Sequence, residues 1–315
     1  MLSCQICKNK QIIFFSKINS FNYFRCDNCR TLFVYPQPLK KILNNYYKKN
    51  FSFNAGYQNE NRTREQAKKI IGTLIKLNPK GKTLLDIGSG YGYFLEEAYK
   101  IKLLVCGIEP SERLYQLTST CLAGRQVEHL IKVFNTNFEN YYQNNKNKRF
   151  DFITLNHIIE HLENPCDAIE KISTLLNKSG ILYIETPNLN SHLFNAEQKN
   201  YTFLTPPEHL WIFSQKSIQQ IVNNISTLKI IKSSTYSYPE HLMGITKKKF
   251  QILNIKSQIN PKDRKINKNA LCFNLKLLLK KLKYLLLDKL IAPSLTPILN
   301  LGGYGSILEH YIKKK

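Results

Sequence analysis

The chain has 315 residues, 43% of them hydrophobic, and carries a formal net charge of +24 at pH 7. This length accommodates one α/β domain with smaller attachments, and the absence of an apolar run of about eighteen residues argues against a membrane-spanning helix. The N-terminus has no continuous apolar segment typical of a signal peptide, so we expect an intracellular, cytoplasmic protein. The charge predicts an anionic partner, or it reflects a surface rich in Lys and Asn.

The first predicted element is a small module, residues 1–35, with two Cys-x-x-Cys pairs. Cys4 and Cys7 form the first pair, Cys26 and Cys29 form the second, and the β-prone runs IIFFS and FNYF lie between them. In an intracellular protein, two such pairs predict zinc rather than disulfides. Four thiolates leave no open coordination position, so we expect a structural zinc ribbon without catalysis.

Residues 36–64 are rich in Tyr, Asn and Lys, and we expect them to form a linker or lid. A helix is predicted over residues 62–77, because apolar residues recur there at helical spacing.

From Lys82 onward, apolar runs alternate with helix-like stretches. Continuously apolar strands between helices predict a parallel sheet covered on both faces. The runs are TLLDI, LLVCGI, LIKVF, FDFITL and ILYIE. Asn164 as N-cap and Pro165 at the first helical position predict where the helix after the fourth strand begins.

A glycine loop follows the first of these strands, with Gly88, Gly90 and Gly92 in the pattern G-x-G-x-G. Glycine there lets the backbone turn sharply and approach a ligand closely. A dinucleotide fingerprint would require glycine where Tyr93 stands.

Two acidic residues accompany this loop. Asp86 precedes it within the strand, where a carboxylate suits a ligand with a cationic amino group. Glu109 ends the second strand, where an acid can accept both hydroxyls of a ribose.

The stretch NHIIEHLENP, residues 156–165, contains His157, Glu160 and His161 in the H-x-x-E-H pattern of inverted zinc peptidases. It follows a strand directly and ends at a proline, so it is expected at the ligand-binding edge of the sheet. We therefore favour a loop facing cofactor and acceptor over a zinc hydrolase. A structural hydrogen bond for His161 is the alternative.

After Glu185 a long connection leads to PPEHLWIFS, and loops of such length are usually functional or disordered. Residues 236–315 are expected to form a helical extension. Its Leu/Lys stretch 273–291 predicts an amphipathic helix, which would lie on the inner face of an anionic membrane or pack on the domain or a dimer partner.

Four runs resemble, in order, the motifs of class I S-adenosylmethionine-dependent methyltransferases: LLDIGSGYGYF, CGIEPS, RFDFITLNHIIEHLENP and SGILYIETPN. The resemblance covers residues 65–235 and implies an α/β fold with a Rossmann-like seven-stranded methyltransferase sheet. It implies S-adenosylmethionine as cofactor, with its methionine part at Asp86, Gly88 and Gly90, and its ribose at Glu109. It places adenine at Asn137 and Phe138, and Gly92 and Asn156 complete the expected cofactor site.

A four-cysteine ribbon joined to this core resembles C-methyltransferases of deoxysugars and methyltransferases of bacterial surface-polysaccharide clusters. The former would need a longer chain after residue 235, which argues against C-methylation. The resemblance implies a small-molecule or glycan acceptor, such as a nucleotide-linked sugar. We expect His209 as general base, Glu208 orienting it or steering the acceptor, and His161 as second choice. Packing of His209 on Trp211 is the structural alternative.

Two other functions are compatible with parts of the sequence. An RNA methyltransferase would suit the ribbon and the charge, but LNHI stands where enzymes that methylate base amines carry Asn/Asp-Pro-Pro-aromatic. The second alternative function is that of a non-enzymatic binding module that kept the fold. The intact glycine loop and Glu109 argue against it.

Overall fold

The computed structural model describes residues 2–49, 60–124, 131–238, 240–241, 297–298 and 300–315. It divides into two compact units. The first comprises residues 1–187, 203–233 and 308–315, and the second comprises residues 188–202 and 234–307. The amphipathic helix expected at 273–291 lies outside the described residues. Within the described part of the chain, no helix combines the length and apolar character needed to cross a membrane.

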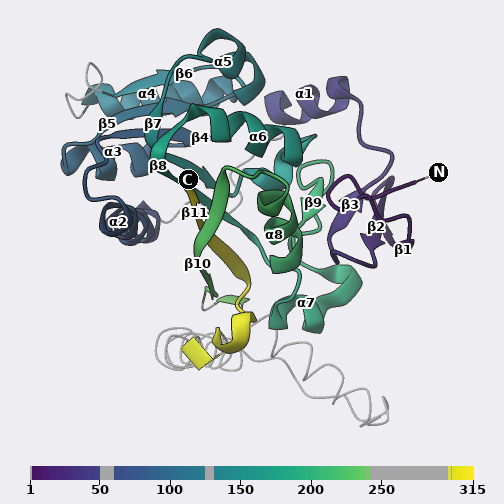
Figure 1. The fold of residues 1–315 in the computed structure, drawn as a ribbon. Coiled ribbons are helices and arrows are strands. Elements are labelled where there is room, and N and C mark those ends of the chain that lie inside the picture. Colours follow the sequence, from purple (N-terminus) through teal and green to yellow (C-terminus); the bar gives the residue numbers. More distant parts are fainter. Residues whose placement is uncertain (1, 50–59, 125–130, 239, 242–296, 299) are drawn as a thin grey trace, which may run out of the picture. The chain divides into compact units, whose positions relative to one another are not determined.

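The main sheet has seven strands in the order β10-β11-β8-β7-β4-β5-β6 (Figure 1). This confirms the predicted Rossmann-like seven-stranded sheet. Its strands are β4 (Thr83–Ile87), β5 (Leu104–Ile108), β6 (Lys132–Phe134), β7 (Phe150–Asn156), β8 (Leu176–Pro187), β10 (Leu228–Tyr236) and β11 (Ile307–Lys314). The pairs β4/β5, β5/β6, β4/β7 and β7/β8 are parallel, so these strands bring their carboxyl ends to one edge.

Helices cover both faces of this sheet. The helices of the first unit are α1 (Lys40–Lys49), α2 (Glu60–Leu77), α3 (Tyr93–Lys100), α4 (Glu112–Gly124), α5 (Phe138–Asn144), α6 (Pro165–Leu175) and α8 (Gln215–Asn223). Neighbouring residues of a strand point to opposite faces, so Leu84 packs in a core with α2 and α3 while Leu85 packs in a core with α6 and α8. As predicted, Asn164 caps α6 and Pro165 is its first residue.

The predicted boundary of the core at residue 235 is wrong. Residues 307–314, which the sequence assigns to a helical extension, form β11 and lie between β8 and β10 in the main sheet. The stretch ILEHYIKK is short and apolar at its start, and its strand partners lie far away in the sequence. Local patterning therefore could not place it.

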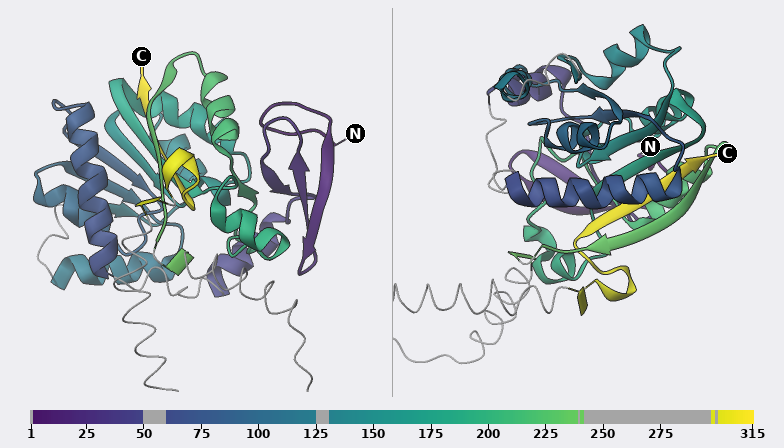
Figure 2. Two further views of the ribbon diagram at one scale, coloured as in Figure 1. Left: turned by 90° about the horizontal axis from the view of Figure 1, so that it is seen from below. Right: turned by 90° about the vertical axis from the view of Figure 1, so that its left-hand side faces the viewer.

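The N-terminal module forms a second, four-stranded sheet in the order β1-β2-β3-β9. Its strands are β1 (Ile12–Ile18), β2 (Phe21–Cys26), β3 (Leu32–Val34) and β9 (Trp211–Ile212). The last of these belongs to the long connection after β8. The ring of Phe33 stacks on that of Trp211 with centroids 5.6 Å apart. The module and α2 lie on opposite sides of the main sheet (Figure 2).

The second unit contains α7 (His192–Glu197) and short 3-10 turns at Gln198–Asn200 and Leu301–Gly303. The Asn188 side chain donates hydrogen bonds to the carbonyl oxygens of Gly303 and Gly305, at 3.0 and 2.7 Å. These bonds join the two chain segments of this unit.

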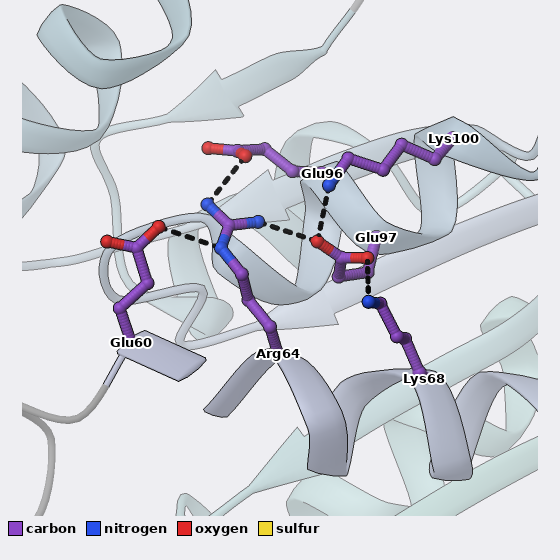
Figure 3. Close-up of polar contacts among 6 residues, drawn as sticks. All are labelled: Glu60, Arg64, Lys68, Glu96, Glu97 and Lys100. Atoms are coloured by element: carbon purple, nitrogen blue, oxygen red, sulfur yellow. Dashed lines mark hydrogen bonds and ion pairs between the residues drawn. The ribbon is translucent and has the colours of Figure 1, made fainter. Parts of the chain in front are cut away.

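An ion-pair network joins α2 to α3 at the start of the glycine-loop helix (Figure 3). The Arg64 guanidinium contacts Glu60, Glu96 and Glu97 at 2.8, 2.8 and 2.7 Å. It also lies over the ring of Tyr93, 4.6 Å from the centroid. Because Tyr93 is the first residue of α3, this network fixes the helix that begins where the glycine loop ends.

Candidate functional site

The predicted site residues gather at the carboxyl edge of the main sheet. The glycine loop follows β4, Glu109 follows β5, residues 157–161 follow β7, and Glu185 lies near the end of β8. In open α/β sheets this edge is where ligands bind.

The three loop glycines all have positive φ, at +79° for Gly88, +53° for Gly90 and +75° for Gly92. A Cβ on Gly88 would come within 2.0 Å of the Ile158 side chain. The glycine loop therefore packs directly on the turn that carries the H-x-x-E-H pattern. This packing requires glycine at position 88.

Glu109 is buried and accepts two backbone hydrogen bonds, from Gly90 N at 2.9 Å and Ser111 N at 2.8 Å. Burial raises its pKa. Asp86 is also buried and accepts hydrogen bonds from Thr154 Oγ1 at 2.6 Å and Asn156 Nδ2 at 3.2 Å. Burial raises the pKa of Asp86 to about 7, although these two hydrogen bonds act to lower it. Two buried carboxyl groups at the loop suit a ligand that brings its own positive charge.

The two residues expected at adenine have local structural roles. The Asn137 side chain caps α5 by accepting a hydrogen bond from Asn140 N at 2.8 Å, and Phe138 is buried in the core. Asn135 donates to the Glu109 carbonyl oxygen at 3.1 Å, so it lies nearer to the ribose acid. Asn135 was not among the predicted site residues, although its position directly after β6 was an available signal. Adenine contacts at Asn137 and Phe138 stay a prediction.

His157 bridges two buried carboxylates. Its Nδ1 lies 3.2 Å from Glu160 Oε1 and its Nε2 lies 3.1 Å from Glu185 Oε1. Burial lowers the pKa of His157, but the hydrogen bonds to these two carboxylates outweigh it and raise the pKa to about 10. The imidazole is therefore a cation at neutral pH. Glu185 was missed as a site residue, although an acid near the end of a buried strand was a signal.

Glu160 is fully buried. Besides its contact with His157, its Oε2 accepts a hydrogen bond from Thr186 Oγ1 at 2.9 Å. Burial raises the pKa of Glu160, but the His157 cation outweighs it and holds the pKa at about 2. The carboxylate is thus ionised inside the protein.

His161 and His209 come from different segments and meet beside Glu160. Their ring centroids lie 4.8 Å apart in an edge-to-face arrangement. Burial, and then the neighbouring His209, lower the pKa of His161 to about 4, and burial lowers that of His209. Both imidazoles are therefore neutral at pH 7. The sequence placed both in the acceptor region, and the structure brings them together.

Backbone carbonyls orient both rings. Nδ1 of His161 lies 3.0 Å from the Glu208 carbonyl oxygen, and Nδ1 of His209 lies 2.7 Å from that of Phe203. The Phe203 carbonyl, rather than the Glu208 side chain, thus contacts Nδ1 of His209, and the other role expected of Glu208, steering the acceptor, stays a prediction. The Glu208 carboxylate instead accepts a hydrogen bond from Tyr46 of α1 at 3.1 Å. His209 does not pack on Trp211, whose ring stacks on Phe33 and Phe213.

The N-terminal module holds the backbone of His209. Tyr23 Oη donates to the His209 carbonyl oxygen at 2.6 Å. Thr31 Oγ1 donates to Ile212 at 3.0 Å, and Ser214 Oγ donates to Cys29 O at 2.6 Å. The segment that carries His209 thus leads directly into β9 of the four-stranded sheet.

The four cysteines of the module converge as a metal site requires. The Sγ atoms of Cys4 and Cys29 are 3.6 Å apart, those of Cys7 and Cys26 are 3.5 Å apart, and all four lie within 4.8 Å of one another. A tetrahedral zinc ion with Zn–S bonds of about 2.3 Å needs sulfur separations of roughly 3.8 Å. Lys8 and Arg30, which follow the first and the second cysteine pair, both have positive φ. The two turns thus share this backbone conformation.

Comparison with known proteins gives a consistent result. The model of a family described as "Methyltransferase domain" matches residues 58–225, more than half of the chain. The ubiquinone biosynthesis O-methyltransferase of Coxiella burnetii is 27% identical over 139 residues, 43% of this chain and 57% of that protein. The protein of the same name from Glaesserella parasuis is 30% identical over 115 residues, 34% of this chain and 46% of that protein. The chain spans about half the length of the curated relatives it matches.

Among solved structures, the plantazolicin methyltransferase BpumL in complex with SAH has a TM-score of 0.50 and 15% identity, covering 89% of this chain and 92% of that one. A second BpumL structure, in complex with a monoazolic desmethylPZN analog and SAH, also has a TM-score of 0.50, at 16% identity, covering 88% and 90% of the two chains. At such identity the likeness establishes the fold alone.

Proposed function

The chain belongs to the methyltransferase-domain family, and we propose that it transfers a methyl group from S-adenosylmethionine to an oxygen atom of a small-molecule acceptor. The observation that carries this proposal is the adjacency of two groups of residues. The glycine loop with Asp86 and Glu109 packs, through Gly88 and Ile158, on the turn that bears Glu160 and His161. A cofactor site and an acid–base cluster therefore share one edge of the sheet.

Methyl transfer requires alignment of the two reactants and removal of a proton from the acceptor. The sulfonium of S-adenosylmethionine is already activated, so the enzyme mainly positions acceptor and methyl group in line. The buried carboxyl of Asp86 suits the cationic amino group, and Glu109 suits the ribose hydroxyls. A hydroxyl acceptor must also lose its proton. The neutral imidazole of His209 assists that loss in this proposal.

Oxygen is favoured as the acceptor atom by the relatives, which are named as O-methyltransferases. Their names refer to ubiquinone biosynthesis, whereas the four-cysteine module resembles glycan-cluster enzymes. A quinone-type acceptor and a nucleotide-linked or polysaccharide sugar are thus two candidates. Incubation with methyl-labelled cofactor and separated lipid, glycan, nucleotide and RNA fractions distinguishes them. Label in RNA alone would contradict a small-molecule acceptor.

We expect His209→Ala to lower the rate of methyl transfer about 100-fold or more, the usual contribution of a positioned acid–base group. Cofactor affinity should stay unchanged, because the glycine loop and Glu109 do not involve His209. The measurements are single-turnover transfer and calorimetric binding of S-adenosylhomocysteine.

His192→Ala is the matched control, since His192 lies outside the cluster and stacks near Tyr304. It should leave the transfer rate unchanged. Full activity of His209→Ala would remove His209 from the mechanism.

We also propose that Cys4, Cys7, Cys26 and Cys29 hold a structural zinc ion. The sulfur separations support this proposal, because they are close to those of a tetrahedral thiolate site. The ion would fix the two turns of the module and, through β3 and β9, the segment that carries His209.

A further inference from the structure

Three side chains with metal-ligand chemistry converge outside the four-cysteine module. They are Glu160 and His161, from the turn after β7, and His209, from the segment before β9. One ligand atom of each lies within 4.8 Å of those of the other two. Glu160 and His209 are 49 positions apart in the sequence. A hydrogen bond from Leu210 N to the Glu160 carbonyl oxygen, at 2.9 Å, joins their two segments.

Both imidazoles have the tautomer that a ligand needs. A carbonyl oxygen only accepts hydrogen bonds, so Nδ1 of His161 and Nδ1 of His209 each carry the proton that faces Glu208 O or Phe203 O. In this tautomer the lone pair of each ring is on Nε2. A backbone carbonyl on the opposite ring nitrogen is the usual support of a metal-binding histidine.

The carboxylate is held in the same way. Thr186 Oγ1 contacts one oxygen of Glu160 and His157 Nδ1 contacts the other. A carboxylate has about four lone-pair positions, so each oxygen can accept one more partner. The other ring nitrogen of His157 contacts Glu185, so the ring is held from both sides. Two imidazole nitrogens and a carboxylate oxygen that converge within 4.8 Å favour a cation.

We propose that Glu160, His161 and His209 bind a divalent transition-metal ion, and that the acceptor hydroxyl coordinates this ion during methyl transfer. Two imidazoles and one carboxylate suit Mn²⁺, Fe²⁺, Co²⁺ or Zn²⁺ better than Ca²⁺ or Mg²⁺. Three protein ligands leave coordination positions open, as in catalytic rather than structural sites. An acceptor with a second oxygen next to the hydroxyl can fill two of them.

This inference rests on the proposed function and changes one step of it. The ion lowers the pKa of the coordinated hydroxyl, so the proton passes to water rather than to His209. The acceptor oxygen then forms the C–O bond as the methyl C–S bond breaks, and the electron pair of that bond returns to sulfur. His209 and His161 act as ligands in this step.

The direct test is Mn²⁺ binding to the full chain, after a mild chelator treatment that keeps the thiolate-bound ion. Loss of the free Mn²⁺ electron-paramagnetic-resonance signal counts the bound ions. We expect one Mn²⁺ per chain in the natural protein. His161→Ala and His209→Ala should each weaken binding at least tenfold, and so should Glu160→Gln.

The matched controls are Glu163→Gln, an exposed acid three residues from Glu160, and His192→Ala. Both should bind Mn²⁺ like the natural protein. Circular dichroism and binding of S-adenosylhomocysteine establish that each variant is folded. This check matters most for the buried Glu160, and the two histidine variants keep the test decisive if Glu160→Gln does not fold.

The outcomes separate this inference from the proposed function. Methyl transfer that needs Mn²⁺ or another transition metal, together with the expected binding losses, supports both. A folded protein that transfers methyl groups but binds no Mn²⁺, Co²⁺, Fe²⁺ or Zn²⁺ beyond the thiolate-bound ion overturns the metal site and leaves His209 as a base. Metal binding without methyl transfer to any acceptor overturns the proposed function and leaves the site.

Discussion

At the scale of single residues, burial of Asp86 lowers the stability of the protein at neutral pH. It is almost fully buried, and burial raises its pKa to about 7 from an ordinary value of 3.8. The unfolded chain therefore loses this proton at lower pH than the folded protein does. Below pH 4 the Asp86 carboxyl is protonated in both the folded and the unfolded state, so burial of the residue does not lower the free energy of unfolding. Between pH 4 and 7 the free energy of unfolding falls, and above pH 7 the loss is complete.

We expect Asp86→Asn to remove this pH dependence. At pH 7.5 the free energy of unfolding of the variant should exceed that of the natural protein by roughly 2–4 kcal/mol, and at pH 4 the two should be nearly equal. Affinity for S-adenosylmethionine should fall about tenfold or more, because the variant lacks the carboxylate that we propose as the partner of the cofactor amino group. Denaturant titrations at several pH values and calorimetry measure both effects. A variant that is less stable at pH 7.5 and binds normally would show that Asp86 is structural.

At the same scale, the residues of the cofactor loop were predictable and the partners of the histidines were not. Asp86, Gly88 and Glu109 follow from a strand–loop–helix pattern within a short stretch. By contrast, the contact of His209 with the Phe203 carbonyl depends on how the long connection after β8 folds back. The same holds for the pairing of His157 with Glu185, which are 28 positions apart in the sequence. No local period encodes these contacts.

Among the elements, α2 and α3 depend on the network around Arg64. The side chains of Glu96 and Glu97 are only 4% and 2% exposed, and the Arg64 guanidinium forms an ion pair with each of their carboxylates. We expect Arg64→Ala to lower the free energy of unfolding by about 2–4 kcal/mol, because it leaves buried carboxylates with fewer cations nearby. Lys68 and Lys100 still contact Glu97, which limits the loss.

Lys68→Ala is the matched control on the same helix. Its side chain is 66% exposed and its Nζ lies 3.8 Å from Glu97, so its removal should cost less than about 1 kcal/mol. Urea titrations of the two variants measure the difference. Equal losses would mean that the Arg64 contacts add little beyond surface charge. Helix α2 itself was predicted from its apolar spacing, but the pairing of Arg64 with residues of α3 needed the packed structure.

The whole molecule joins its N-terminal module to the candidate site through β9. Because β3 pairs with β9 and Tyr23 holds the His209 carbonyl, we expect loss of the four-thiolate site to disturb His209. Cys4→Ser should abolish binding of the proposed zinc ion and lower the rate of methyl transfer at least tenfold. Binding of S-adenosylhomocysteine should change less than about threefold, since the glycine loop belongs to the main sheet.

Cys166→Ser is the control, because this cysteine lies at the start of α6 and is not one of the four ligands. Elemental analysis, single-turnover transfer and calorimetry give the three quantities. A Cys4→Ser protein that lacks zinc but transfers methyl groups at the natural rate would separate the module from the site.

The sequence by itself determined the parts whose signal is local: alternating apolar strands and helices, the glycine loop with its two acids, and two cysteine pairs. Each depends on residues within one turn, one strand or one loop, where periodicity and spacing carry the information. Only the tertiary structure decided that residues 307–314 complete the main sheet, that β9 completes the ribbon sheet, and that Glu160, His161 and His209 meet. Those contacts join segments far apart in the chain, and packing of the whole molecule selects them.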